Sequence, residues 1–537
     1  MAEVQNPILP GFNPDPSILR VGDDYYIACS TFEWYPGVSI HHSKDLVNWQ
    51  LIARPLNRLN QLDMRGNPDS CGVWAPCLSY DNGVFYLVYT DTKRFAGDFK
   101  DTPNYYVTTT DIRGQWSDPI YLNSSGFDPS LFHDDDGRKY ITNMVWDHRK
   151  VRGRNNWLPH KYFGGMMLQE LDVETGKLVG PAKNVFPGSD IGLSEGPHIY
   201  KRNDYYYMVV AEGGTGKDHA ATFARSKSIW GPYEVDPDGP LVTSAHTPSA
   251  RLRRSGHGDL VETDDGQWYF VHLCSRPLVN RGRSVMGRET AIQPVTWNKE
   301  GWPRLASGGQ SPLESFEVNL PPATEPRATH QRLSFDGGEL PLDFQSLRYP
   351  LPQSIMNQTE RNDYLKLAGQ QSLGALFEQS LLARRQQAFK FTAETQLDFS
   401  PQSFQQMAGL VCYYNAQKYY YLHLTHDENL GRVLDLSMCC NDWHALYPMT
   451  EMIDIPNEGE IRLKAEIDHD LLWFHWSLVG EPWQMIPFPL DYSVLSDEVG
   501  EGGGDANFTG AFVGMACQDL SGQQHPAFFK YFDYQEQ

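Results

Sequence analysis

The sequence predicts an all-β protein with two domains, and three observations support this prediction. A segment made of two short strands and a polar turn recurs five times within the first three hundred residues. After about residue 310 the repeat ends, and apolar and polar residues alternate strictly along several stretches. Helical periodicity is sparse throughout the chain. The two parts of the chain therefore differ in organisation, but both are built from strands.

The repeated segments can be laid over one another, and each has a short apolar strand, a polar turn and an aromatic-rich strand. They begin at Asp15, Ala75, Asp128, Gly196 and Gly258. Their turns contain Asp-Asn-Gly, Asp-Gly or Asn-Asp, which tolerate the positive φ angles of tight hairpins. Consecutive segments start 53 to 68 residues apart, which is enough for a four-stranded blade with its loops. Five blades around one axis form a five-bladed β-propeller, which we expect over residues 1–312.

The C-terminal part has a different composition and a different sequence pattern. The stretch VNLPPATEPRATHQR (318–332) is rich in Pro and Thr, which is typical of a linker, and we place this linker at residues 313–332. Beyond it, FKFTAETQLDF (389–399) and IRLKAEID (461–468) alternate in the manner of half-buried antiparallel strands. Residues 333–537 are therefore expected to form a β-sandwich of the jelly-roll or concanavalin-like type.

Bulk properties exclude several classes of partner. The 537 residues carry a net charge of −22, so neither nucleic acid nor an anionic membrane is expected as a partner. No run approaches the ~20 apolar residues of a membrane span, and the first residues do not resemble a signal peptide. The eight cysteines lack CxxC spacing, which indicates neither a disulfide framework nor a zinc site. We therefore expect a cytoplasmic protein with reduced thiols.

The starts of the repeats carry the candidate functional residues. In a propeller the innermost strands crowd the axis, so the starts of the five first strands should converge at one end of the central channel. These positions hold Asp15, Trp74, Asp128, Glu195 and His257. Three carboxylates, an indole and an imidazole are therefore expected to meet in one cavity.

Carboxylates that meet in this way can split a glycosidic bond. One, kept protonated by its surroundings, gives a proton to the leaving oxygen, while the other takes a proton from the attacking water. A third would raise the pKa of the acid by like-charge repulsion. The aromatic residues at or near the blade starts, Phe32, Trp74 and Phe127, suit the apolar faces of a sugar ring.

Plainer interpretations stay open for each of these residues. An Asp before Pro at a strand start is often a turn former, and clustered acids can also bind calcium. His257 could be a hydrogen-bonded core histidine, and Arg288 in GRETA could be a salt-bridge partner. The glycine-rich GGTGKD (213–218) lacks the spacing of a phosphate-binding loop.

An ordered set of motifs along the chain closely resembles glycoside hydrolase family 43, and more narrowly its two-domain β-xylosidases. The resemblance covers essentially the whole chain. The motifs are NPILPGFNPDPSI, STFEWYPGVSIHHSKDLVNW, GVWAPCLSY, GFDPSLFHDDDG, SEGPHIYK, GRETAIQPVTW and FTGAFVGMACQDLSG.

The resemblance implies an inverting exo-hydrolase that releases D-xylose from the non-reducing ends of 1,4-β-xylo-oligosaccharides. Asp15 matches the general base, Glu195 the general acid, and Asp128 the acid that modulates the pKa of the general acid and orients it. The positions that resemble the pocket lining are Phe32, Trp74, Phe127, His257, Arg288 and Phe508. Of these, Phe508 resembles a residue that the sandwich inserts to close one side of the site.

The resemblance also implies a homo-oligomer, a tetramer or a dimer, and a possible side activity on α-L-arabinofuranosides. It implies no required cofactor; a calcium ion near the pocket histidine occurs in some relatives and is not assumed here. The segment 147–165 is longer and more basic than expected for the family. It could shape the leaving-group side of the site, form an oligomer contact, or be an ordinary surface loop.

Three alternative functions remain to be separated from a β-xylosidase. The first is an enzyme whose main activity is α-L-arabinofuranosidase, which a comparison of aryl glycosides distinguishes. The second is a propeller that binds sugar without chemistry; the presence of both Asp15 and Glu195 argues against it. The third is an endo-acting arabinanase or xylanase, which needs an open cleft rather than a closed pocket.

Overall fold

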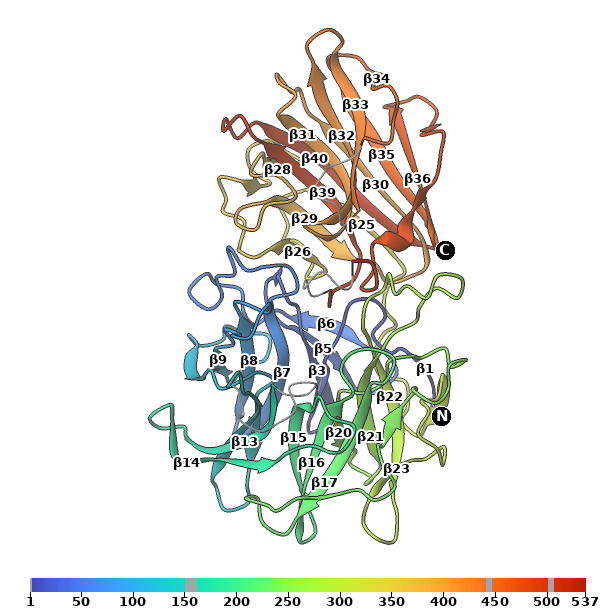
Figure 1. Ribbon diagram of the computed structural model, residues 1–537. Helices are drawn as coiled ribbons and strands as arrows, with labels where there is room; N and C mark the ends of the chain where they lie inside the picture. The colour runs from blue at the N-terminus through green and yellow to red at the C-terminus, as the bar shows by residue number, and fades with distance from the viewer. Residues whose placement is uncertain (1, 150–161, 441–446, 501–506) are drawn as a thin grey trace.

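The computed structural model describes residues 2–149, 162–440, 447–500 and 507–537, and these form two stacked all-β domains (Figure 1). The lower domain is a five-bladed β-propeller and the upper one a β-sandwich, which confirms the predicted fold class. One short 3-10 helix, η1 (Tyr492–Val494), is the single helix in these ranges. Within them, no helix has the length and apolar character needed to cross a membrane.

Each propeller blade is an antiparallel sheet whose first strand comes from one of the repeated segments. The first blade contains β2 (Ser17–Val21), β3 (Asp24–Cys29), β5 (Ser39–Ser43) and β6 (Gln50–Ala53). The second contains β7 (Gly72–Asp81), β8 (Val84–Thr92), β9 (Asn104–Thr109) and β10 (Ile120–Asn123). The third contains β11 (Ser130–His133), β12 (Lys139–Trp146), β13 (Phe163–Asp172) and β14 (Lys177–Phe186).

The last two blades follow the same order. The fourth contains β15 (Glu195–Arg202), β16 (Tyr205–Glu212), β17 (Ala220–Ser226), β18 (Glu234–Val235) and β19 (Val242–Thr243). The fifth contains β20 (Gly258–Glu262), β21 (Trp268–Cys274), β22 (Glu289–Trp297) and β23 (Pro303–Leu305). The first strands β2, β7, β11, β15 and β20 therefore start the five blades, as the repeat predicts.

The stretch expected to be a linker, 313–332, contains ordered strands. β24 (Ser315–Val318) pairs with β1 (Ala2–Gln5) in a small sheet, so the start of the chain is fixed to the end of the propeller. β25 (His330–Ser334) begins inside the same stretch and already pairs with the last strand of the sandwich. The Pro-rich composition between the two strands concealed both of them, because four or five residues carry too little periodicity to identify a strand.

The sandwich is made of two sheets. One contains β25, β27 (Met356–Asn357), β28 (Leu365–Ala368), β30 (Lys390–Asp398), β35 (Ile461–Asp468), β36 (Leu471–Leu478), β37 (Gln484–Met485), β38 (Leu490–Asp491) and β40 (Pro526–Glu536). The other contains β4 (Trp34–Tyr35), β26 (Phe344–Leu347), β29 (Ser380–Arg385), β31 (Gln406–Asn415), β32 (Lys418–Asp427), β33 (Gly431–Cys440), β34 (Ile453–Asp454) and β39 (Phe512–Asp519).

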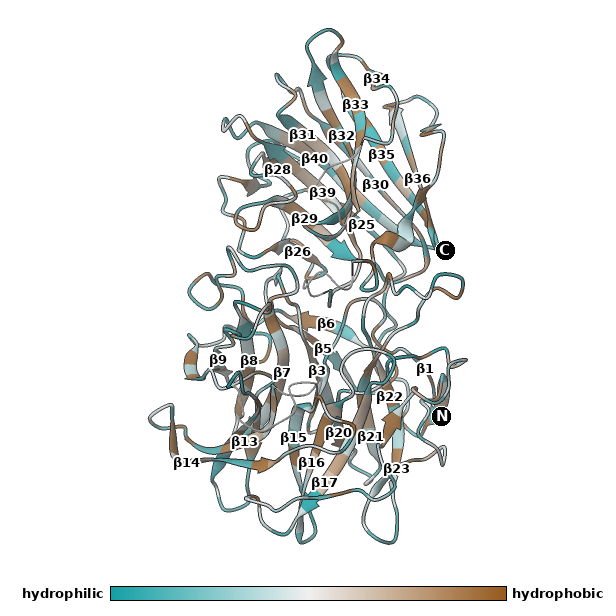
Figure 2. Cartoon of the chain, in the orientation of Figure 1, coloured by the Kyte–Doolittle hydropathy of each residue, from teal (hydrophilic) through white to brown (hydrophobic). Residues whose placement is uncertain are grey.

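The alternation that predicts the sandwich is present in its strands. Along β35 every second residue is buried, and the apolar positions Ile461, Leu463, Ala465 and Ile467 join the core between the sheets. Figure 2 shows the same pattern as apolar colour along the strands and polar colour over many of the connecting loops. The core of the sandwich is therefore formed by one face of each sheet, as alternating strands require.

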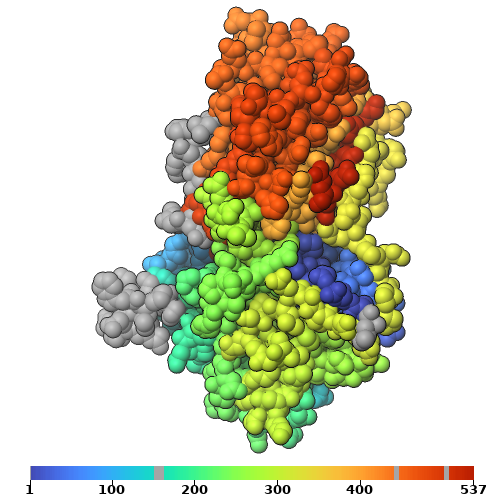
Figure 3. Space-filling model, turned by 90° about the vertical axis from the view of Figure 1, so that its right-hand side faces the viewer, coloured from blue at the N-terminus to red at the C-terminus, as the bar shows by residue number. Residues whose placement is uncertain are grey.

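The two domains are joined by shared structure as well as by contact. Strand β4, which belongs to the propeller part of the sequence, pairs with β26 and extends a sandwich sheet into the propeller. Trp34 in β4 stacks on Phe512 with ring centroids 3.6 Å apart. The buried Arg348 forms a 2.8 Å ion pair with Asp69. Figure 3 shows the sandwich seated directly on the propeller, with green propeller loops rising to meet it.

Candidate active site

One cavity of about 230 Å³ contains every site residue that the sequence predicts. Its lining includes Asp15, Phe32, Trp74, Phe127, Asp128, Glu195, His257, Arg288 and Phe508. Eight of these residues come from the propeller part of the chain, and Phe508 comes from the sandwich part, just before β39. The structure therefore brings together side chains separated by nearly five hundred residues in the sequence.

The blade starts explain this convergence. Asp15 and Asp128 lie just before the first strands β2 and β11, and Glu195 is the first residue of β15. His257 precedes β20, and Trp74 lies near the start of β7. Because the five first strands open at the same end of the channel, residues at these positions point into one space.

The backbone at the two Asp-Pro steps is unusual. Asp15 and Asp128 have φ angles of 53° and 55°, in the left-handed region that residues other than Gly, Asn and Asp seldom adopt. Gly196, after the third acid, has φ of 56°, and a Cβ there would lie 2.6 Å from the His257 ring. Left-handed backbone of this kind concentrates at functional sites, since only a well-determined surrounding maintains it.

The carboxylate of Asp15 is held at both oxygens. Arg288 donates from Nη1 to Oδ1 at 2.7 Å, and the Ser30 hydroxyl donates to Oδ2 at 2.7 Å. The Asp15 side chain is almost completely buried. Arg288 also donates from Nη2 to the carbonyl oxygen of Phe508 at 3.3 Å, so the same guanidinium connects Asp15 to the sandwich. These contacts fix the position and orientation of the carboxylate.

Glu195 lies in a different environment. Burial first, and then the charge of Asp15, raise the pKa of Glu195 to about 7, against the opposing effect of Arg288 and Lys100. Among the described residues, none donates a hydrogen bond to its carboxyl group. A carboxyl group that is protonated near neutral pH and not engaged by the protein can give its proton to a bound molecule.

Asp128 sits beside Glu195. Its Oδ2 accepts a 3.2 Å hydrogen bond from the backbone N–H of Gly196, the residue after Glu195. Burial, Glu195 and Asp15 together raise the pKa of Asp128 well above its usual value. The sequence interpretation gives Asp128 the task of raising the pKa of Glu195. Ionisation of either of these two buried neighbours disfavours ionisation of the other, and the charge of Asp15 acts on both, so this expected role of Asp128 stays a prediction.

His257 is neutral in this site. Burial lowers the pKa of His257 to about 4, and its Nδ1 lies 3.8 Å from Oδ1 of Asp15. Its backbone N–H donates to Nε2 of His219 at 2.9 Å, and Nδ1 of His219 lies 3.1 Å from the Glu212 carbonyl oxygen. Because Nε2 of His219 accepts this hydrogen bond, Nδ1 of the same ring carries the proton and donates a hydrogen bond to the carbonyl oxygen of Glu212. The His219 imidazole therefore holds the backbone of His257, and the His257 ring forms part of the cavity wall next to Asp15.

Aromatic rings form the other walls. Trp74 lies at the centre of this surface, with its ring centroid 5.0 Å from that of Phe127, 6.2 Å from Phe32 and 6.1 Å from Phe508. The backbone N–H of Phe508 donates to the Ser70 hydroxyl at 3.0 Å, and the Trp74 indole donates to the Ser70 carbonyl oxygen at 3.0 Å. Ser70 therefore holds one ring from each domain in place.

The sequence interpretation missed several residues of the lining: Phe95, Lys100, Trp146, Phe163, Gly214 and Thr215. All but Lys100 lie just after the second strand of a blade, near its end, or at the start of the third strand. In an antiparallel blade the second strand ends at the face where the first one begins. That rule could have identified these positions, because the strand ends were visible in the repeats; the exception is Lys100, which lies eight residues beyond the end of β8.

Lys100 is the missed residue with a charge. Its ammonium lies 3.7 Å from the Phe95 ring centroid and 4.3 Å from the Trp146 ring centroid, and it donates to the Phe95 carbonyl oxygen. Burial lowers the pKa of Lys100 to about 8. The cavity therefore has a cation beside Phe95 and Trp146, whose charge also acts on Glu195.

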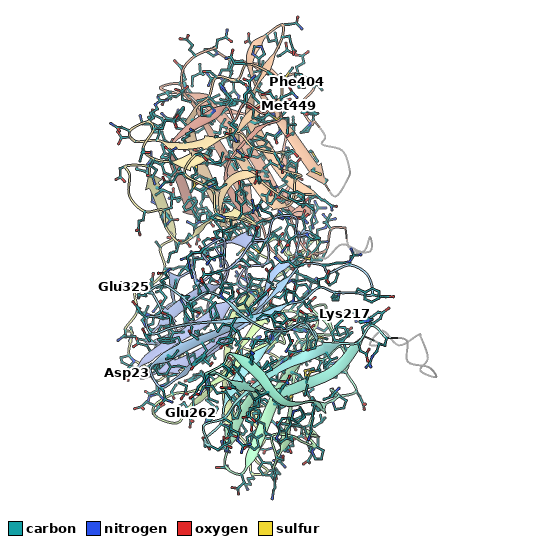
Figure 4. The ribbon with its side chains drawn as sticks, turned by 90° about the vertical axis from the view of Figure 1, so that its left-hand side faces the viewer. Asp23, Lys217, Glu262, Glu325, Phe404 and Met449 are labelled. Atoms are coloured by element: carbon teal, nitrogen blue, oxygen red, sulfur yellow. The ribbon has the colours of Figure 1, made fainter. Side chains whose placement is uncertain are left out.

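Two segments singled out in the sequence border this region. The glycine-rich stretch 213–218 supplies Gly214 and Thr215 to the wall, whereas Lys217 lies at the outer edge of the propeller and pairs with Asp218 (Figure 4). Of the basic segment 147–165, residues 150–161 lie outside the described residues. The described remainder contributes Phe163 to the cavity, and the expected role of the segment stays a prediction.

Two known family profiles match the chain along most of its length. The profile described as glycosyl hydrolases family 43 matches residues 4–303. A second profile, described as the beta xylosidase C-terminal concanavalin A-like domain, matches residues 332–535. The two matches fall on the propeller and on the sandwich.

Individual proteins are similar over nearly the full length. The chain is 53% identical to Xylosidase/arabinosidase 43B of Humicola insolens, over 99% of this chain and 98% of that protein. It is 48% identical to a beta-xylosidase of Bacillus subtilis, over 99% of this chain and all of that protein. The crystal structure of a xylan beta-1,4-xylosidase from Bacillus halodurans superposes with a TM-score of 0.94 at 50% identity, covering 99% of this chain and 100% of that one.

Proposed function

The chain belongs to glycosyl hydrolases family 43, and on this premise we propose that it is an exo-acting, inverting glycosidase that releases D-xylose from the non-reducing ends of 1,4-β-xylo-oligosaccharides. The observation that carries the proposal is the cavity of about 230 Å³ in which three acidic side chains face an aromatic wall. A small space with an aromatic wall and convergent charged and polar groups suits a single sugar ring.

The proposed mechanism divides the chemistry between two carboxyl groups. Asp15, held by Arg288 and Ser30, takes a proton from a water molecule as that water attacks the anomeric carbon. Glu195, whose raised pKa keeps it largely protonated below about 7, gives its proton to the leaving glycosidic oxygen. Asp128 positions Glu195 through the backbone N–H of Gly196.

Exo action is supported by the contribution of the sandwich. Phe508 reaches the propeller and packs near Phe32 and Trp74, with ring centroids 6.0 and 6.1 Å away. An endo-acting enzyme needs a cleft open at both ends so that a long chain can pass through. A ring inserted by the second domain closes one side instead, so a sugar chain enters by its terminal residue.

Xylopentaose distinguishes these modes of action directly. We expect only xylose and xylotetraose as early products, with xylose released as the α-anomer from the β-linked substrate, whereas endo action would also give xylobiose and xylotriose from the start. Proton NMR of the first turnovers measures the anomer, and chromatography measures the products. Xylose that appears first as the β-anomer would contradict the inverting mechanism, and internal cleavage of longer oligosaccharides would contradict exo action.

The second candidate function is an α-L-arabinofuranosidase, supported by the similar protein named as a xylosidase/arabinosidase. Both sugars are pentoses that present similar shapes to an aromatic pocket. We expect aryl β-D-xyloside to have the higher kcat/KM, with a smaller value for aryl α-L-arabinofuranoside. A reversed order in this pair of assays would make arabinofuranoside hydrolysis the main activity.

We also propose that catalysis needs no cofactor, since the two carboxyl groups account for both proton transfers. Prolonged incubation with EDTA, followed by assay in chelated buffer, is expected to leave kcat/KM within about twofold of the untreated value. A large loss that added Ca²⁺ reverses would instead indicate a calcium ion in or near the cavity.

Assembly and location are the last two proposals. We propose a homo-oligomer, a tetramer or a dimer, because large apolar side chains such as Val279 and Phe404 are exposed. Light scattering after gel filtration measures the number of chains in the assembly.

We propose a cytoplasmic location, which is supported by buried thiols such as Cys29, Cys274 and Cys412 that form no disulfide. Fractionation of the source cells tests it.

A further inference from the structure

A second cavity, of about 250 Å³, lies where the two domains meet. Its propeller side comes from residues 8–13 and from strands β5 and β6, and its sandwich side comes from residues 327–331, 343 and 384–387. None of the described residues lines both this cavity and the active site. It is therefore a separate space, formed only when the sandwich sits on the propeller.

Three buried arginines surround this interdomain cavity. Arg384 and Arg385, at the end of β29, line it directly. Arg54 follows β6, and its Nε donates to the carbonyl oxygen of Leu342 at 3.0 Å. Leu342 precedes Asp343, which lines the cavity. All three arginines are at most 4% exposed. Each one therefore carries its charge inside the protein.

No salt bridge within 4.0 Å neutralises these arginines among the residues described. The partners of Arg384 are the side-chain oxygens of Gln331 and Gln387. Those of Arg385 are the Phe12 carbonyl oxygen and the side chains of Asn13 and Gln345. All of these acceptors are neutral. A charged group buried with neutral partners alone is costly, and a carboxylate or another anion is its usual companion.

Several donors around the cavity also lack a partner among the described residues. They are Nη1 and Nη2 of Arg54, Nε of Arg384 and Nε of Arg385, each with almost no exposed surface, so a bound anion would have to come within the reach of groups that now face the protein. Burial lowers the pKa of Arg385 to about 10, and burial together with Arg385 lowers that of Arg54. A guanidinium keeps its proton in proteins. The lowered pKa values therefore mean that both arginines stay charged in surroundings that are unfavourable for a positive charge.

The acidic groups nearby do not balance this charge. Asp343 is the carboxylate of the cavity lining; its charge opposes the lowering of the pKa of Arg385 and Arg54, but it forms no ion pair within 4.0 Å among the described residues. Glu536 accepts two 2.6 Å hydrogen bonds from Arg327, so its charge is already used. Burial and the neighbouring arginines lower the pKa of His41, which leaves it neutral. Positive charge therefore exceeds negative charge around the cavity.

We propose that the interdomain cavity binds a small oxyanion, either inorganic phosphate or the carboxylate of a sugar acid. Guanidinium groups match the oxygens of both groups with paired N–H donors. The indole of Trp49 in the wall offers a surface for the ring of a sugar acid, which phosphate does not use. The bound anion joins propeller to sandwich, and through that contact it stabilises the arrangement in which Phe508 reaches the active site.

Calorimetry on the full chain tests this. Phosphate and D-glucuronate are titrated separately at constant ionic strength, with D-xylose as a neutral control, and Tm is recorded for each. We expect one of the two anions to bind once per chain and to raise Tm by about 1–3 °C at a hundredfold excess over its Kd. The anion that binds shows whether the cavity accepts inorganic phosphate or the carboxylate of a sugar acid.

Matched variants locate the binding. Arg384→Met and Arg385→Met, the two arginines that line the cavity, are each expected to weaken anion binding at least tenfold and to remove the Tm rise. Arg281→Met is the control, since the ion pair of Arg281 with Asp470 also joins the domains but lies elsewhere. If neither anion gives saturable heat, the cavity holds water only and the proposal is wrong. Unchanged anion binding in both cavity variants, or displacement of glucuronate by xylose, overturns it as well.

Discussion

Replacement of Asp15 by Asn should reduce kcat/KM on every substrate by about 10²–10⁴-fold, the range that a general base contributes. Asparagine keeps the shape: its Oδ1 can accept from Arg288 and its Nδ2 can donate to the Ser30 hydroxyl, but it cannot take a proton from water. Because the lost step is activation of water, the loss should be similar for xylobiose and for aryl xylosides. Steady-state kinetics on both substrate types measures this.

The matched control for this variant is Asp23→Asn, in the exposed turn of the same hairpin and visible at the edge of the molecule in Figure 4. It should leave kcat/KM unchanged. Because Arg288 is buried and loses its charged partner, the Asp15 variant also needs a thermal unfolding curve. Retained activity in a folded Asp15→Asn protein would refute its role as the base.

Replacement of Glu195 by Ala should affect substrates unequally. Hydrolysis of xylobiose, whose leaving group needs a proton, should fall by about 10²–10⁴-fold, whereas a dinitrophenyl xyloside should lose less than about tenfold. The reason is that an acidic phenol departs as its anion without help. Comparing kcat/KM for the two substrates in wild type and variant gives the result. Equal losses on both would count against Glu195 as the acid.

The same residue predicts the pH dependence. Since Glu195 must be protonated and its pKa is raised to about 7, kcat/KM of the wild type on xylobiose should fall as pH rises through about 7. In Glu195→Ala this alkaline fall should disappear for the dinitrophenyl substrate. Glu262→Ala, at the exposed end of β20 and labelled in Figure 4, is the control and should retain the wild-type profile.

Local patterns made the fold predictable. Each hairpin carries its turn residues and its aromatic second strand within a few positions, so the five repeats are visible without any long-range information. The repeat then predicts the meeting of Asp15, Asp128 and Glu195, because equivalent positions in a closed ring share one axis. The alternation in β35 likewise marks a half-buried strand.

Other features depend on contacts between residues that lie far apart in the sequence, and local patterns do not predict them. Trp34 and Tyr35 form a strand of two residues whose partner, β26, lies about three hundred positions away, and nothing local indicates that pairing. Lys100 reaches the cavity from a loop that has no counterpart of equal length in the other blades. The pKa of Glu195 depends on burial by both domains and on the charge of Asp15, so the sequence could indicate a pair of acids but not their environments.

The strand pairing of β4 with β26 limits how this protein can be divided. A propeller produced alone would expose the edge of β4, the face of Trp34 that stacks on Phe512, and the Asp69 carboxylate that Arg348 neutralises. It would also lack Phe508, which forms part of the wall of the active-site cavity. The two domains are therefore not interchangeable modules: recombining this propeller with an unrelated second domain would need a new edge strand, a new aromatic partner and a new cation at matching places.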